Sequence, residues 1–77
     1  MNKIYIVVEE YSYEHSDEYK IILLTEDKET ALSWAKGREL LDGNALSVKC
    51  IVYERNLNVP SCFNSEGIIF ERSSEEK

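Results

Sequence analysis

The sequence predicts an α+β domain with the element order ββαββ, in which a small, mostly antiparallel sheet carries one helix packed on one face. Two segments rich in β-branched residues come first, one segment of helical periodicity follows, and an alternating segment and a short apolar segment come last. A chain of 77 residues can build only one core. We therefore expect a single domain over residues 1–77, with residues 72–77 as a solvated tail.

Four strands are predicted. KIYIVVEE at 3–10 and EYKIILLT at 18–25 flank the polar segment YSYEHSD, which favours an antiparallel hairpin with a long tip. ALSVKCIVYER at 45–55 has the clearest period of two, and GIIFERS forms a short last strand. A right-handed crossover through the helix places the third strand beside the first and parallel to the second, with the last strand at an edge.

The helix is predicted to follow a cap at Thr25 and to run to about Asp42, where Gly43 stops it. Acidic residues in the first turn suit the helix dipole. Gly37, within the helix, suggests a close approach to the sheet. The face toward the sheet is predicted from apolar residues at steps of three and four: Ala31, Leu32, Trp34, Ala35 and Leu41.

The strands contain more apolar residues than one helix can cover. The expected core set on the helix side is Ile4, Ile6, Val8, Leu46, Val48, Cys50 and Val52. The surplus face then carries Tyr5, Val7, Ile51 and Tyr53, which are candidate interface residues. Either the loop at 56–67 covers this face with Leu57, Val59, Pro60 and Phe63, or the face is a homodimer or partner interface.

Negative charge is concentrated near the amino terminus. Residues 9–29 hold eight carboxylates against Lys20 and Lys28, and this segment accounts for the whole net charge of −6. Direct nucleic-acid binding is disfavoured, because it needs clustered lysine and arginine. A protein partner with a basic surface is favoured, and tyrosines between the acids suit recognition. The predicted partner-binding residues are Glu9, Glu10, Tyr11, Tyr13, Glu14, Asp17 and Glu18.

A sharper hypothesis is that these acids imitate DNA phosphates and block a basic nucleic-acid-binding protein. Alternate strand residues lie about 6.6 Å apart, close to the phosphate repeat of one strand. However, the hairpin tip and the helix start lie at opposite ends of the second strand, roughly 20 Å apart. The acids are therefore expected to form two clusters unless the loop bends back.

Catalysis, metal binding and cofactors are not expected. His15 lies between Glu14 and Asp17, but no known metal-ligand spacing is matched. There is no glycine-rich phosphate loop and no nucleophile elbow. Cys50 and Cys62 form no CxxC pair, and Cys50 is expected in the core. No membrane span or secretory signal is recognised, so we expect a cytoplasmic protein.

KIYIVVEE, EYKIILLTEDKETALSWAKG and VKCIVYER together resemble short uncharacterised bacterial and phage proteins of ββαβ type, over residues 3–55. The resemblance implies an α+β fold, a bacterial or phage source and, for a phage protein, a role in the host cytoplasm. The leading hypothesis is a non-enzymatic acidic protein that binds and inhibits or modulates a host protein. The alternative is a self-associating, homodimeric structural or accessory protein without a charged partner.

Overall fold

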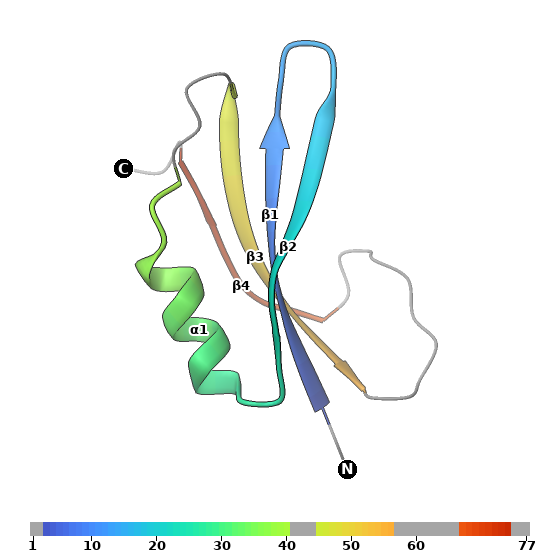
Figure 1. Cartoon of the computed structure of the whole chain (residues 1–77), viewed down its shortest axis with the longest axis vertical. Helices are drawn as coiled ribbons and strands as arrows, with labels where there is room; N and C mark the ends of the chain where they lie inside the picture. The colour runs from blue at the N-terminus through green and yellow to red at the C-terminus, as the bar shows by residue number, and fades with distance from the viewer. Residues whose placement is uncertain (1–2, 41–44, 57–66, 75–77) are drawn as a thin grey trace.

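The computed structural model describes residues 3–40, 45–56 and 67–74. Two strands, β1 (Lys3–Ser12) and β2 (Asp17–Thr25), precede the helix α1 (Lys28–Gly37), and β3 (Ser47–Asn56) and β4 (Ile68–Ser73) follow it. The order ββαββ is the one that the sequence predicts. Figure 1 shows the helix beside the sheet, with the β1–β2 hairpin extending beyond it at the opposite end from the start of α1.

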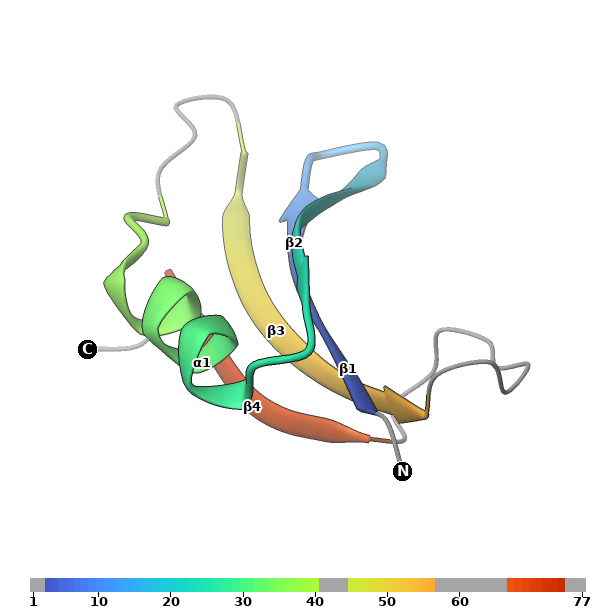
Figure 2. The same cartoon turned by 60° about the horizontal axis from the view of Figure 1, so that its bottom comes forward.

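The four strands form one antiparallel sheet in the order β2-β1-β3-β4. Because β1 is antiparallel to both of its neighbours, β2 and β3 run in the same direction, as predicted for two strands joined by a crossover through the helix. The predicted strand order is confirmed, with β4 at an edge. Figure 2 shows that β3 curves strongly along its length, so the sheet is far from flat.

The helix is shorter than predicted at both ends. Asp27 is the N-cap: its Oδ1 accepts a hydrogen bond from the Glu29 amide at 3.1 Å, and its Oδ2 accepts one from the Thr30 hydroxyl at 2.6 Å. Thr25, two residues earlier, instead accepts a bond from the Asp27 amide at 3.0 Å. A carboxylate with two local donors makes the stronger cap, and the prediction of Thr25 is wrong by two residues.

The helix ends at Gly37, and Arg38 already has an extended backbone with ψ of 142°. The prediction that it continues to Asp42 is therefore wrong, and residues 41–44, with Leu41 and Gly43, lie outside the described residues. The space where a side chain at Gly37 would begin is open, so this glycine does not mark a close approach.

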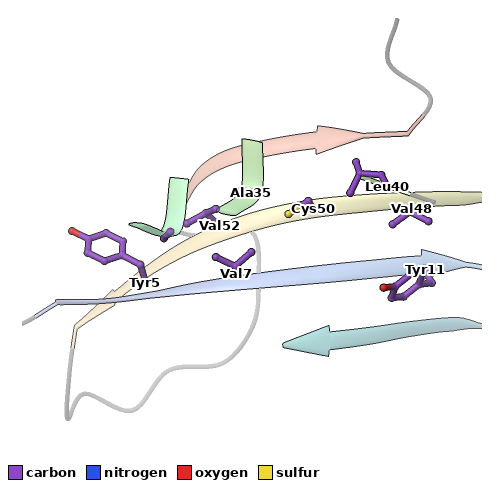
Figure 3. Packing of buried hydrophobic residues seen from close by; sticks show 9 residues of the cluster. Tyr5, Val7, Tyr11, Ala35, Leu40, Val48, Cys50 and Val52 are labelled. Atoms are coloured by element: carbon purple, nitrogen blue, oxygen red, sulfur yellow. The ribbon is translucent and has the colours of Figure 1, made fainter. Parts of the chain in front are cut away.

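The β1 residues that face the helix are the odd-numbered ones, not the even-numbered ones that the sequence predicts. Figure 3 shows Ala35 of α1 above Val7, Cys50 and Val52. Tyr5, Val7 and Tyr11 belong to this cluster, and Val7 lies opposite Val52 across the strands. The prediction that Ile4, Ile6 and Val8 face the helix is wrong. Ala31 and Ala35 are buried as expected, but Trp34 is 46% exposed rather than packed on the sheet.

The face away from the helix is also apolar. Val8, Ile51 and Tyr53 form a second buried cluster, with Ile6 and Ile68 packed against it. A surplus apolar face therefore exists, although Ile6 and Val8 occupy the places expected for Tyr5 and Val7. The proposed cover at 56–67 lies almost wholly outside the described residues.

The last strand ends at Ser73, as the segment GIIFERS predicts, and it overlaps the predicted tail. Arg72 lies within β4, and Ser74 still pairs with β3, its amide donating to the Val48 carbonyl at 2.8 Å. The Ser74 hydroxyl in turn accepts a bond from the Val48 amide at 3.0 Å. The prediction of a solvated tail from residue 72 is therefore wrong for residues 72–74.

Candidate binding site at the β1–β2 hairpin

The hairpin is closed by a tight turn rather than a long tip. The Tyr13 amide donates to the Ser16 carbonyl at 2.8 Å, and the strands are paired from Ser12 and Asp17 onward. Glu14 and His15 alone occupy the turn, both strongly exposed, with 3.8 Å between His15 Nε2 and Glu14 Oε1. The segment is thus an ordered ladder that holds its side chains at fixed places along the strands.

The predicted partner-binding residues divide into three groups. Glu14, Asp17 and Glu18 are exposed on the hairpin, and Glu10 and Tyr13 are partly exposed. These five stay accessible to a partner. Glu9 and Tyr11 are buried, with Glu9 only 2% exposed, so neither can present its polar group to a partner. Their assignment to the surface is wrong, because the odd-numbered residues of β1 face the helix.

Glu9 belongs to a polar network inside the core. The Arg38 guanidinium donates to both of its carboxylate oxygens, from Nε to Oε2 and from Nη2 to Oε1 at 3.4 Å, and the Tyr11 hydroxyl also donates to Oε1. A buried charge is tolerated only when it is paired and hydrogen-bonded in this way. The bond to Glu9 raises the pKa of Arg38 above its ordinary value.

A second arginine secures the end of the helix. Arg72 on β4 donates from Nη1 to the carbonyl of Ala35 at 2.8 Å and to that of Arg38 at 2.7 Å. These carbonyls include one that the helix leaves without an internal partner, and a cation is favourable at this end of the dipole. Nearby, burial raises the pKa of the Cys50 thiol, which makes this cysteine a poor nucleophile.

The four candidate interface residues lie on two different faces. Tyr5 and Val7 pack in the cluster beneath the helix, so their predicted place on the surplus face is wrong. Ile51 and Tyr53 do lie on the face away from the helix. Both are buried, so they are not open for a partner in this structure.

The accessible apolar surface lies instead on β2. Tyr19 is 68% exposed and Ile21 57%, and Leu24 is exposed further along the strand. Tyr19 is opposite Glu10 and Ile21 is opposite Val8, which places both on the face away from the helix. In the register, Leu24 is likewise opposite Ile6. This strip extends the second apolar cluster outward to the edge of the sheet.

Sequence reasoning missed this strip and the network around Glu9. The sequence does not predict which face of the sheet each apolar residue of the second strand occupies, because all four residues of IILL are apolar. An arginine 29 positions after Glu9 gives no periodic signal that could connect the two. The one signal in the sequence is that Glu9 alternates with Tyr5, Val7 and Tyr11, so these four residues share a face of the strand.

An open hollow of about 530 Å³ lies on the helix side, lined by Ser33, Trp34, Gly37, Arg38 and Glu39. Arg38 reaches from it into the core toward Glu9. Within the described residues, no group of three or more histidine, cysteine or carboxylate side chains could hold a metal ion.

Among the described residues, no helix is long and apolar enough to cross a membrane. Comparisons of the chain with protein-family models, with curated proteins and with solved structures found no match. The resemblance to bacterial and phage proteins therefore stays a prediction, and the fold is established as a small α+β arrangement of four antiparallel strands and one helix.

Proposed function

We propose that this chain is a small, non-enzymatic protein-binding domain whose β1–β2 hairpin binds a partner protein with a basic surface. The observation that supports this proposal is the ordered hairpin, on which Glu14, Asp17 and Glu18 are exposed beside the exposed ring of Tyr19. An aromatic side chain between charges provides contact area at small entropic cost, and the charges select the partner.

The balance of charge around the hairpin favours a basic partner. Lys20 lies over the Tyr11 ring, 5.1 Å from its centre, and Lys49 lies near Glu71 at 3.9 Å. Among the described ion pairs, neither Asp17 nor Glu18 has a lysine or arginine partner. The field at the tip is therefore negative and would accelerate encounter with a positive surface.

Mimicry of DNA is the more specific form of the proposal. The hairpin tip and the start of α1, with its own acids Glu26 and Glu29, lie at opposite ends of β2 (Figure 1). A partner that recognises a short acidic patch would engage the hairpin alone. A partner that reads a longer row of phosphates would need both clusters. Inhibition of a host protein rests on the resemblance to bacterial and phage proteins.

The test is affinity capture from a bacterial lysate with three forms of the protein. The hairpin variant carries Glu10→Gln, Glu14→Gln and Asp17→Asn. A helix variant carries Glu26→Gln, Glu29→Gln and Glu39→Gln, in and beside α1. It changes the net charge equally, because it also neutralises three carboxylates, and all three of these residues are exposed.

We expect wild type and the helix variant to retain the same basic protein, to lose it as salt rises, and the hairpin variant to lose it at low salt. Equal retention by all three forms would exclude the hairpin as the binding surface. Failure of the wild type to retain any basic protein would contradict the proposal itself. Once a retained partner has been purified, titration calorimetry would give its affinity for each of the three forms.

A further inference from the structure

Within the described part of the chain β2 pairs only with β1, and its first five residues, 17–21, are all exposed. Edge strands present a row of unpaired backbone groups and are usually shortened, covered or charged. This edge carries charge, but also Tyr19 and Ile21, two of the most exposed large apolar residues.

The hairpin closure fixes which backbone groups point outward. Tyr13 and Ser16 form a hydrogen-bonded pair. In an antiparallel ladder such pairs alternate, so Glu18 and Lys20 point their N–H and C=O groups toward β1. Asp17, Tyr19 and Ile21 then direct theirs to the outer side, where a second strand could bond them.

A β-bulge limits how far such pairing can run. Val8 is opposite Ile21 but Val7 is opposite Leu23, so Ile22 is an extra residue in β2. Beyond it the side chains change face relative to the first half of the strand. The regular outer edge therefore consists of residues 17–21, with the sequence DEYKI.

This short segment is its own charge complement. Two copies related by a twofold axis pair antiparallel about a central residue. A centre at Glu18 or Lys20 puts like charges directly opposite each other, which is unfavourable. A centre at Ile21 runs into the bulge. With the centre at Tyr19, the two Tyr19 residues form one hydrogen-bonded pair, and Asp17 of each copy forms another with Ile21 of the other copy. Glu18 of each copy then lies opposite Lys20 of the other.

We infer that a second copy of this chain binds along β2 in the register centred on Tyr19, so that the sheets of the two copies become one. The two Tyr19 rings lie together on the face away from the helix. Each Glu18 pairs with the Lys20 of the other copy at the closely spaced positions of the ladder. The dimer points its two hairpin tips in opposite directions. Each Glu18 is then paired with a lysine, so the acids of the hairpin left for a basic partner are Glu10, Glu14 and Asp17.

The test is the molecular mass by sedimentation equilibrium over a wide range of concentration, on wild type and charge variants. Wild type should show a reversible monomer–dimer equilibrium. Glu18→Lys and Lys20→Glu each place like charges opposite each other twice, and each should raise the dimer dissociation constant about tenfold or more. The double variant Glu18→Lys/Lys20→Glu restores opposite charges and should return to the wild-type constant.

An equimolar mixture of the two single variants is the decisive measurement. The first carries lysine at both positions and the second glutamate at both, so a heterodimer in this register has only opposite charges across the seam. Circular dichroism of each variant alone tests whether it is folded. A wild type that stays monomeric at every concentration overturns the inference. So do single variants that dimerise like wild type, or a mixture that does not associate.

Discussion

Replacement of Arg38 by methionine tests how the core holds a buried carboxylate. Methionine keeps much of the volume of the arginine stem but removes both donors to Glu9 and the positive charge. The carboxylate of Glu9, which is 2% exposed, would keep, among its bonds to described residues, only the one from the Tyr11 hydroxyl. The ion pair gains its importance from this burial, since an exposed pair would contribute little.

The expected loss is large for a domain of this size. Breaking a buried ion pair by removing one partner costs about 3 to 5 kcal/mol. The Arg38 side chain is itself 32% exposed, so water can partly replace it, and we expect about 2 to 4 kcal/mol. The whole domain is stable by roughly 4 to 12 kcal/mol, at the usual value per residue. The variant should therefore lose about a sixth of this stability or more.

Urea unfolding followed by far-ultraviolet circular dichroism gives the free energy. A second variant, Glu9→Met/Tyr11→Phe/Arg38→Met, removes all three polar groups of this network together. We expect it to be within about 1 kcal/mol of wild type. A loss below about 1 kcal/mol for Arg38→Met would show that Glu9 does not depend on this cation. Equal losses for both variants would assign the effect to packing.

Three further measurements probe the ends of the elements. The bond from Thr30 lowers the pKa of Asp27. The ionised Asp27 carboxylate therefore stabilises the fold above the ordinary aspartate pKa, and this stabilisation is lost as pH falls through the lowered pKa. Asp27→Asn should keep the cap, and its melting temperature should fall less at acidic pH than that of wild type. Gly67 has φ of +77°, and a side chain there would begin 2.6 Å from the Glu54 carbonyl, so Gly67→Ala should cost about 1 to 3 kcal/mol in urea unfolding. Arg72→Gln should cost about 2 kcal/mol by the same measurement, because the helix end loses two charge-assisted bonds; an unchanged midpoint would mean that water replaces them.

The strand order could be read from the sequence, but the faces of β1 could not. KIYIVVEEY is apolar in both alternations up to Val8, so its period of two has no phase. Glu9 would ordinarily set the phase by pointing to water, and here it points inward to Arg38. An ion pair between distant segments overrides local pattern, and this one pair explains the inverted faces of the strand.

The ends of the helix could not be predicted, also because contacts between side chains decide them. Thr25 and Asp27 are both good cap residues, and the sequence does not show that Thr30 donates to Asp27. At the other end, leucines at 40 and 41 continue the helical spacing past the observed stop. Arg38 leaves the helix there, its guanidinium bonded to Glu9 and its carbonyl to Arg72.

The sequence indicates a candidate segment but not which of its residues reach the surface. Charge density alone identified residues 9–19, and the structure separates them into a buried pair and an exposed set. The self-complementary edge at 17–21 was readable only once the closing bond between Tyr13 and Ser16 fixed which backbone groups point outward.

The bonds from Arg72 have a consequence for the order in which this chain can mature. During synthesis the hairpin and the helix leave the ribosome well before β4, so the carbonyls of Ala35 and Arg38 must first be solvated by water. The helix end gains its final partners only after residue 72 has emerged. A nascent chain arrested before β4 would therefore carry a frayed helix beside a sheet whose β3 edge is bare.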